Sequence, residues 1–338
     1  MTELKIRIIS LALFAVTSAC VSGSPKHDAF ICASVNKNYV IGSKIVTTSG
    51  LHLRDETGQW QHLGLNDVSL SAVSFDPRDH DTFYTAALNG ALRTLDGGET
   101  WRIMTGWDIT EPKDICVDPN EPNTIYLGHP GGVAVSPDQG MTWLRMEKGL
   151  PDRGKYTQTI EVDRTRSGRV LAGCESGIYL TEDGAASWRR VLATEETVGD
   201  IQQSPHDRDL WLAVTQSAGA WVSRDRGATW TVLPGVPSTA TLYNVAFDAT
   251  DPQRLAIGSY TFGVFTSEDA GDTWMVRNAG LPDPARVWSL CVDPDTGRLY
   301  AGVYKVALYT SDDFGRTWEN GGLEGSTIHS FSFRPKAR

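Results

Sequence analysis

Short runs of alternating hydrophobic and polar residues follow one another along the chain from about residue 30 to the C-terminus. Each run spans only about four to six residues, and Gly, Pro, Asn or Asp stands at its ends, where tight turns need them. Asp-Pro closes one run, as at Asp76-Pro77, and a Gly opens another, as in Gly177–Thr181. The 3.6-residue period of an amphipathic helix is absent. The pattern therefore predicts short antiparallel strands and excludes leucine-rich and helical repeats.

An eight-residue motif, Ser/Thr-x-Asp-x-Gly-x-Thr/Ser-Trp, recurs through this pattern. It is complete in Thr94–Trp101, whereas Ala185 replaces its Gly in Thr181–Trp188 and the copy in Leu53–Trp60 keeps only the Asp and the Trp. Successive aspartates stand 41 to 45 residues apart, which indicates an internal repeat. The motif aspartates are Asp55, Asp96, Asp138, Asp183, Asp225, Asp269 and Asp313, and its tryptophans are Trp60, Trp101, Trp143, Trp188, Trp230, Trp274 and Trp318.

Each residue type in the motif suits a tight hairpin turn. An Asp accepts hydrogen bonds from the backbone N–H groups just ahead of it, and a Gly adopts positive φ without a Cβ clash. The Trp begins the next strand and covers a large area of the sheet beside it. We therefore interpret the motif as structural and assign its aspartates no catalytic role.

Four short strands in each repeat of about 43 residues, seven times over, predict an all-β, seven-bladed β-propeller of four-stranded antiparallel blades. Eight segments qualify as first strands of a blade, including Ala29–Val35 and Thr327–Phe333. We expect the C-terminal strand to be the innermost strand of the blade that contains Asp55 and to close the ring. The N-terminal stretch would then lie outside or beside it.

The repeated box resembles that of the Asp-box (BNR) propellers, which include sialidases, xyloglucan-active glycoside hydrolases, sortilin-type domains and the photosystem II assembly-factor family. The resemblance covers residues 30–335 and implies the propeller fold. It does not imply one function, because those relatives do unrelated things on one scaffold.

The N-terminus has the layout of an export signal. Lys5 and Arg7 precede the apolar stretch Ile8–Val16, and small residues lead to Cys20. Thr17-Ser18-Ala19-Cys20 resembles a bacterial lipoprotein signal with lipidation at Cys20, although Thr17 stands where Leu or Val is usual, so cleavage after Ala19 without a lipid stays open. The expected division is a signal peptide (1–19), a flexible tether (20–29) and the propeller (30–338), in an exported protein that is either a periplasmic or cell-surface lipoprotein or freely secreted.

Composition narrows the partners. The chain has 338 residues, of which 40% are hydrophobic, and 41 acidic residues outnumber 31 basic ones without a basic cluster, so nucleic acid is not expected as a partner. Membrane attachment is expected only through a lipid on Cys20, because no apolar run is long enough to span a bilayer.

Four further cysteines lack the close spacing of a metal site. We expect them to be buried small hydrophobes, and we expect no metal or cofactor to be bound. They are Cys32, Cys116, Cys174 and Cys291.

Binding residues are expected on the face opposite the box turns, called the top face here, where the entrances of the first strands and the turns between second and third strands meet the axis. A hydrated channel rim and simple packing of the rim are the alternatives. Aromatic residues on this face could stack on sugars or contact a protein. The expected ligand-binding residues are Trp107, Lys113, Asp114, His129, Tyr156, Glu175, Asp200, Gln216, Tyr243, Tyr260, Arg286, Trp288, Tyr304, Lys305 and His329.

Catalytic machinery is not recognisable in the sequence. A glycosidase needs two carboxylates about 5–9.5 Å apart, and the acids near the axis are Asp114, Glu161, Asp200 and Glu175. The chain lacks the Arg-Ile-Pro-like segment of sialidases. Where the similar xyloglucan-active enzymes carry a catalytic Asp, it has Ser43-Lys44, or Leu88-Asn89 one blade on.

These observations favour an exported, monomeric, non-catalytic propeller that acts as a binding or assembly platform for a protein or glycan at the top face. The alternative is a carbohydrate-active hydrolase or lyase of the sialidase-like or xyloglucanase-like propeller type, with the four acids as candidates.

Overall fold

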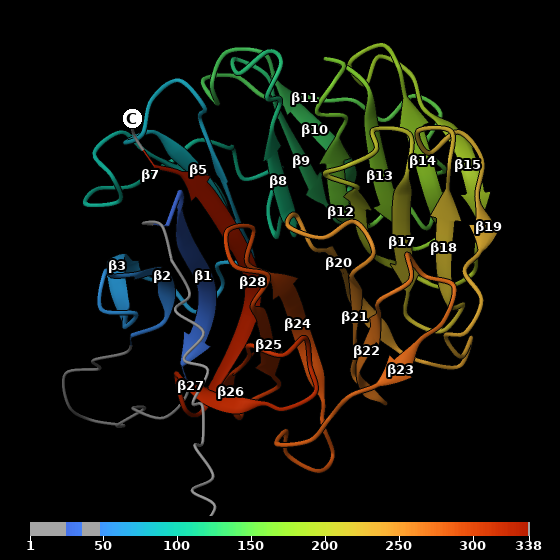
Figure 1. The fold of residues 1–338 in the computed structure, drawn as a ribbon. Coiled ribbons are helices and arrows are strands. Elements are labelled where there is room, and N and C mark those ends of the chain that lie inside the picture. The colour runs from blue at the N-terminus through green and yellow to red at the C-terminus, as the bar shows by residue number, and fades with distance from the viewer. Residues whose placement is uncertain (1–24, 36–47, 337–338) are drawn as a thin grey trace, which may run out of the picture.

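Seven four-stranded antiparallel sheets form a closed ring in the computed structural model, which describes residues 25–35 and 48–336 (Figure 1). The expected seven-bladed propeller is thereby confirmed. In chain order, blade 1 contains β28, β1, β2 and β3, and blades 2 to 7 contain β4–β7, β8–β11, β12–β15, β16–β19, β20–β23 and β24–β27. In these described ranges there is no helix, and so none long and apolar enough to cross a membrane.

The innermost strand of each blade lies along the axis, and its two neighbours around the ring are the innermost strands of the adjacent blades. These strands are β28 (Ser326–Pro335), β4 (Ala72–Phe75), β8 (Asp114–Val117), β12 (Thr157–Val162), β16 (Val198–Gln203), β20 (Leu242–Phe247) and β24 (Val287–Val292). The second strands are β1 (His27–Val35), β5 (Phe83–Ala87), β9 (Ile125–His129), β13 (Val170–Cys174), β17 (Trp211–Thr215), β21 (Leu255–Ser259) and β25 (Leu299–Val303).

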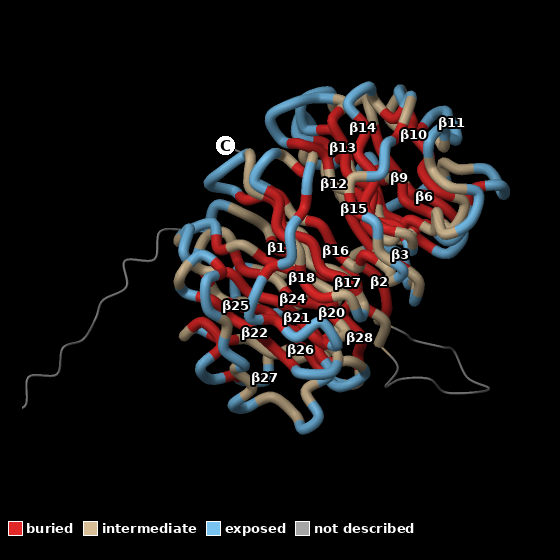
Figure 2. Tube along the Cα trace, turned by 90° about the vertical axis from the view of Figure 1, so that its right-hand side faces the viewer, coloured by how far each residue is buried: buried red, intermediate tan, exposed pale blue. Residues whose placement is uncertain are grey.

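The third strands are β2 (Gly50–Arg54), β6 (Gly90–Thr94), β10 (Gly132–Ser136), β14 (Gly177–Thr181), β18 (Ala220–Ser223), β22 (Gly263–Ser267) and β26 (Ala307–Ser311). The outer strands are β3 (Trp60–Asn66), β7 (Arg102–Ile103), β11 (Leu144–Arg145), β15 (Arg189–Ala193), β19 (Thr231–Val232), β23 (Met275–Val276) and β27 (Glu319–Gly322). Figure 2 shows burial concentrated in the middle of the blades, as in β9, whereas short outer strands such as β11 are exposed.

The C-terminal strand β28 is the innermost strand of blade 1 and pairs with β1 from His27 opposite Pro335 to Val35 opposite Ser326. Closure by the C-terminal strand is thus as predicted. The N-terminal strand β1 lies beside it as the second strand, between β28 and β2, and is not itself a first strand. It begins at His27, so the last three residues assigned to a tether (27–29) already belong to the sheet.

Neighbouring blades share their hydrophobic cores. One cluster, for example, joins Leu212 on β17 of blade 5 to Leu255 on β21 of blade 6. Glycines in the second strands let the next blade approach closely: a Cβ on Gly302 would lie 2.6 Å from Cβ of Ile328 on β28. Packing between neighbouring blades therefore contributes to the stability of the ring, as in other repeat proteins.

The box turns have the hydrogen bonds that the motif predicts. Oδ1 of Asp96 accepts from the Thr100 N–H at 2.9 Å, and the Gly98 N–H donates to Oγ1 of Thr94 at 2.9 Å. Hydrogen bonding, first of all from the Thr100 hydroxyl, lowers the pKa of Asp96 to about 2. Ala185, at the Gly position of its copy, still adopts a φ of 72°.

Candidate functional site

A cavity of about 1410 Å³ follows the propeller axis and opens towards both faces. Its wall consists mainly of the seven innermost strands. The top-face mouth includes Tyr156 and Gln216, and the mouth on the box face includes Arg78 and Arg164. Residues from the innermost strands of all seven blades meet in this cavity.

The residues at the entrance of each innermost strand line the top-face mouth, as expected from their position five residues before the Asp-Pro level. In five blades this residue is the extra residue of a β-bulge. Val287 pairs with Val303 and Ser289 with Gly302, for example, so Trp288 is left without a partner. Bulges commonly re-aim a side chain beside a functional site. The bulged residues are Gln158, Gly199, Tyr243, Trp288 and His329, and Ser71 and Lys113 hold the same level in blades 2 and 3.

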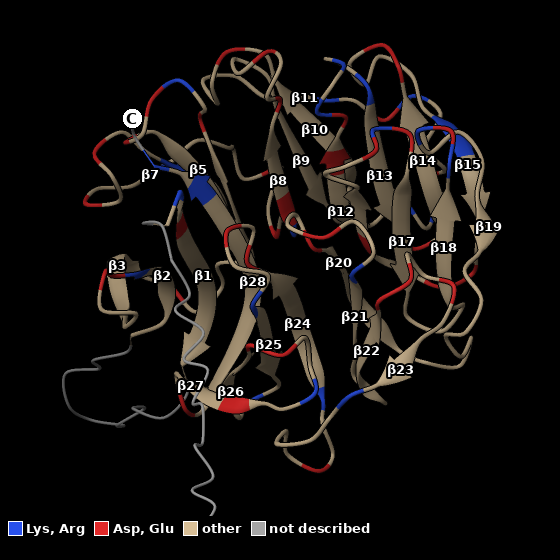
Figure 3. Ribbon diagram, viewed as in Figure 1, with Lys and Arg blue, Asp and Glu red and all other residues tan. Residues whose placement is uncertain are grey.

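Three of the four candidate acids lie on the cavity wall, one from each of three successive blades: Asp114 on β8, Glu161 on β12 and Asp200 on β16. Figure 3 shows the acidic positions on β8 and β12 among the innermost strands. Burial, reinforced by the neighbouring carboxylates, raises the pKa of Glu161 to about 8 and that of Asp114 to about 6, and burial also raises the pKa of Asp200.

These acids bind the backbone of the next blade. Oδ2 of Asp114 accepts from the Ile160 N–H on β12 at 2.9 Å, while its Oδ1 accepts from its neighbour's N–H. Oδ2 of Asp200 accepts from the Val245 N–H on β20 at 3.0 Å. A backbone N–H on β16, that of Gln203, likewise faces Glu161. The carboxylates thus satisfy N–H groups on the exposed edges of innermost strands, which otherwise would face a partly desolvated cavity.

Glu175, the fourth candidate acid, is exposed in the turn between β13 and β14 and is not part of the cavity wall. Ser43-Lys44 lie outside the described residues. In the part of the chain that the structure describes, no three His, Cys, Asp or Glu side chains are arranged to hold a metal ion. The four described cysteines are free; Cys32 and Cys174 are buried, whereas Cys116 and Cys291 are partly buried.

Four of the predicted aromatic residues form one continuous cluster at the top-face mouth, in blades 6 and 7. The ring centroid of Trp288 lies 4.5 Å from that of Tyr243, 5.2 Å from that of Tyr304 and 6.3 Å from that of Tyr260. Each ring is half-buried, so part of its surface stays open. We call Tyr243, Tyr260, Trp288 and Tyr304 the aromatic cluster.

Two cations lie against the aromatic cluster. The guanidinium of Arg286 is 5.6 Å from the ring centroid of Tyr260, and the ammonium of Lys305 is 5.0 Å from that of Tyr304. Both are cation–π distances, and both side chains are exposed. The cluster therefore combines open aromatic surface with two positive charges.

The remaining predicted residues lie apart from the cluster. Trp107, in the loop between β7 and β8, is 93% exposed. His129 is buried at the end of β9, and burial lowers its pKa to about 4. His329 pairs with the hydroxyl of Ser34 at 2.6 Å, and burial together with the charge of Lys113 lowers its pKa to about 4.

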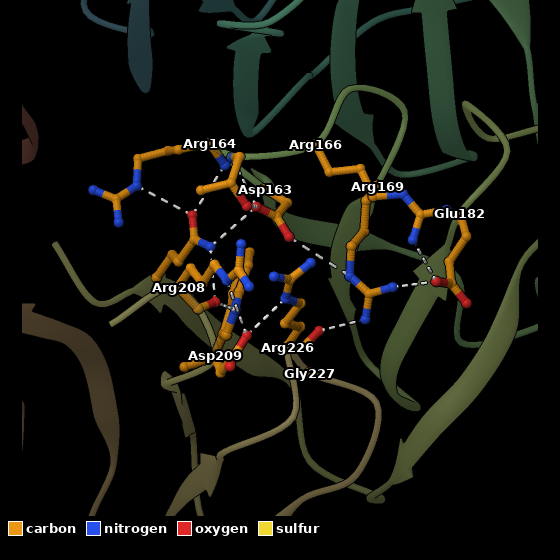
Figure 4. Close-up of polar contacts among 12 residues, drawn as sticks. Asp163, Arg164, Arg166, Arg169, Glu182, Arg208, Asp209, Arg226 and Gly227 are labelled. Carbon is orange, nitrogen blue, oxygen red and sulfur yellow. Dashed lines mark hydrogen bonds and ion pairs between the residues drawn. The ribbon is translucent and has the colours of Figure 1, made fainter. Parts of the chain in front are cut away.

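On the box face, arginines of blade 4 donate hydrogen bonds to blade 5, and ion pairs within each blade hold some of these arginines (Figure 4). Arg169 pairs with Glu182 and donates to the carbonyl oxygen of Arg226 at 2.7 Å, and Arg226 in turn contacts Asp209 at 2.7 Å. Arg164, at the cavity mouth, was not anticipated from the sequence, since a lone Arg after a strand carries no distinguishing signal. Its guanidinium donates to Oε1 of Gln203 at 3.1 Å, an uncharged partner.

The fold and its repeated box define a seven-bladed propeller of the BNR type. Residues 53–224 match the family described as "Photosynthesis system II assembly factor YCF48", and the chain belongs to this family of BNR propellers. Residues 176–337 also match the family described as "Sortilin, neurotensin receptor 3".

Other similar proteins differ in length and activity. A xyloglucanase from Paenibacillus sp is 27% identical over 294 residues, which cover 67% of this chain and 28% of the relative. The chain thus spans less than a third of that enzyme. Among solved structures, the GH74 xyloglucanase from Xanthomonas campestris has a TM-score of 0.63 at 18% identity, covering 80% of this chain and 51% of the enzyme. YCF48 bound to D1 peptide has a TM-score of 0.56 at 19% identity, covering 75% and 82%. Both structures support the fold.

Proposed function

We propose that this protein is a non-catalytic propeller that binds its partner at the top face, through the aromatic cluster. The observation that carries the proposal is the contrast between two parts of the cavity mouth. Asp114 and Asp200 on the cavity wall already accept hydrogen bonds from backbone N–H groups of the next blade. The aromatic cluster keeps open surface and two exposed cations.

Tyr, Trp and Arg are the residues that contribute most to binding surfaces, and aromatic rings also stack on sugars. A relative whose structure is described as bound to a D1 peptide and relatives described as xyloglucanases are consistent with a protein or a carbohydrate as the partner. The proposal therefore covers both classes.

A glycoside hydrolase is the second candidate, favoured by one observation. The pKa of Glu161 is raised to about 8 and that of Asp114 to about 6, so the cavity holds a carboxyl that stays protonated at neutral pH beside more acidic ones. A protonated acid next to an ionised carboxylate is what glycoside hydrolysis needs.

The test is a screen of the purified protein for binding and turnover against sialosides, xyloglucan, arabinan and anionic polysaccharides. We expect binding without turnover, and Asp114→Asn and Asp200→Asn variants that still bind. Turnover of any substrate that disappears in Asp114→Asn or Glu161→Gln would overturn the proposal in favour of the hydrolase, because acid–base assistance alone contributes about 10²–10⁴-fold.

We also propose that the chain is exported as a monomer, with either a lipid on Cys20 or cleavage after Ala19. The support is the sequence pattern of residues 1–20, which lie outside the described residues. Mass spectrometry of the mature N-terminus in wild type and Cys20→Ser distinguishes the two, and sedimentation of the purified protein measures its oligomeric state. A full-length N-terminus would overturn export, and a stable dimer would overturn the monomer.

A further inference from the structure

Three kinds of hydrogen-bonding group in the aromatic cluster have no partner in the described residues. They are the phenol hydroxyls of Tyr243, Tyr260 and Tyr304, the indole N–H of Trp288, and the charged groups of Arg286 and Lys305. Burial raises the pKa of Tyr243, and the two other phenols raise it further. The cluster thus offers unpaired hydroxyls beside open ring faces.

The backbone positions the two residues that carry the cations. The Tyr304 N–H donates to the carbonyl oxygen of Arg286 at 2.9 Å, which ties the strand entrance of blade 7 to its neighbouring turn. Lys305 has a φ of 59°, which fixes the direction in which it leaves the turn. Neither side chain makes an ion pair with a carboxylate among the described residues. Lys113, on the wall of the same mouth, is likewise without an ion pair there.

The main chain around the aromatic cluster, by contrast, is largely used by the fold. The Tyr260 N–H donates to the carbonyl oxygen of Thr241 at 2.9 Å, and Asn278 bonds both the Val264 N–H and the carbonyl oxygen of Phe262. A peptide recognised by strand addition needs free backbone groups. The aromatic cluster therefore recognises its ligand through ring faces, hydroxyls and positive charge.

From this set of groups we infer that the aromatic cluster binds an acidic glycan, one whose sugar rings carry carboxylates. The inference rests on the proposed function and names its ligand. The pyranose faces stack on Trp288 and its neighbouring tyrosines, sugar hydroxyls bond the phenols, and carboxylates pair with Arg286 and Lys305. The glycan lies over blades 6 and 7, because the aromatic cluster and both cations belong to these blades.

Calorimetric titration with two polymers of one backbone tests the charge requirement. Polygalacturonate is compared with its fully methyl-esterified form, and neutral xyloglucan serves as a third ligand. We expect polygalacturonate to bind and the esterified form to bind at least about tenfold more weakly, which corresponds to the loss of about one charge-assisted contact. Affinity should also fall as salt is raised.

Variants locate the site. Arg286→Gln combined with Lys305→Gln should reduce the affinity for polygalacturonate about tenfold and remove most of the preference over the esterified form. Trp288→Ala should weaken the binding of both polygalacturonate and its methyl-esterified form. The matched charge control is Arg102→Gln with Arg190→Gln, two exposed arginines on the outer strands β7 and β15, which should bind like wild type.

Equal binding of xyloglucan and polygalacturonate would overturn the acidic-glycan inference and leave the binding function standing. The acidic-glycan inference would also be overturned if no glycan binds and a purified protein partner binds instead. Loss of that binding in both Trp107→Ala and Trp288→Ala would show a wider protein interface, because Trp107 lies outside the cluster. Turnover that depends on Asp114 or Glu161 would instead overturn the proposed function itself.

Discussion

Asp114 accepts a hydrogen bond from the backbone N–H of Ile160 at 2.9 Å, across the boundary between blades 3 and 4. Asp200 repeats this relationship two blades on, with Val245 at 3.0 Å. In both cases an acid in a partly desolvated cavity satisfies an N–H on the free edge of the next innermost strand. The same two acids that sequence reasoning selects as catalytic candidates are therefore structural links between blades.

The first prediction concerns these links. Asp114→Leu should lower the free energy of unfolding by about 1–3 kcal/mol, because it leaves a buried N–H without an acceptor. Asp200→Leu, the matched variant, should behave alike. Urea unfolding measures both. A change below about 0.3 kcal/mol in both variants would mean that water replaces the carboxylates without cost and that they are not structural links.

The second prediction concerns pH. Glu161 has a folded-state pKa of about 8 against 4.5 in a model peptide. Between these two pH values the folded protein therefore binds one more proton than the unfolded chain, and its stability falls as the pH rises. His52 and His129, which are buried, and His329, which is half-buried, have pKa values lowered to about 4 and the opposite effect, which is strong below about pH 6.5 and small above about pH 7. Between pH 7 and 8 the effect of Glu161 exceeds that of the histidines, and stability should fall by about 0.5 kcal/mol.

Urea unfolding at these two pH values checks this. Glu161→Gln should remove the fall, and Glu175→Gln, which changes an exposed acid outside the cavity, should retain it. If wild type and Glu161→Gln show the same pH dependence, Glu161 is ionised in the folded protein and the proton is bound elsewhere.

Seven blades could be predicted because the box is a local structure. Asp96 bonds groups within four residues of itself, so the motif survives in the sequence of each repeat. The position of β1 was harder to predict, since first and second strands both alternate in polarity. Whether Ala29–Val35 faced the axis depended on β28, almost 300 residues away.

The candidate site, too, could be predicted from the sequence only in part. Counting from Asp-Pro placed Tyr243 and Trp288 at the cavity mouth, because that count is a strand register. It could not reveal that both are bulge residues, nor that their rings lie 4.5 Å apart, because these depend on pairing and packing between blades. The hydrogen-bond partner of Asp114 in the next blade could not be predicted for the same reason.

The third prediction concerns the box tryptophans. Trp230 is 9% exposed and packs in the core cluster that includes Leu171 and Trp211. Trp230→Ala should reduce the free energy of unfolding by about 3–5 kcal/mol. Trp107→Ala is the matched control: at 93% exposure its loss should change stability by less than about 0.5 kcal/mol. A loss below about 1 kcal/mol for Trp230→Ala would contradict a structural role for the box Trp.

The last prediction concerns closure of the ring. Deleting residues 326–338 removes β28 and leaves β1 with an unpaired edge, although Phe30, Ile31 and Cys32 on β1 are at most 1% exposed in the intact protein. An open ring with such an edge should lose cooperative folding and associate with other copies. Thermal melting followed by circular dichroism, with size-exclusion chromatography, measures both effects.

The control is a chain that lacks only residues 337–338. It should melt like the full chain, since β28 stays whole. A peptide of residues 326–338 added to the truncated chain should restore a cooperative transition, because it supplies the missing strand. If the truncated protein remains monomeric and melts near the temperature of the full chain, β28 does not close the propeller, and pairing of β1 with β2 must hold blade 1 by itself.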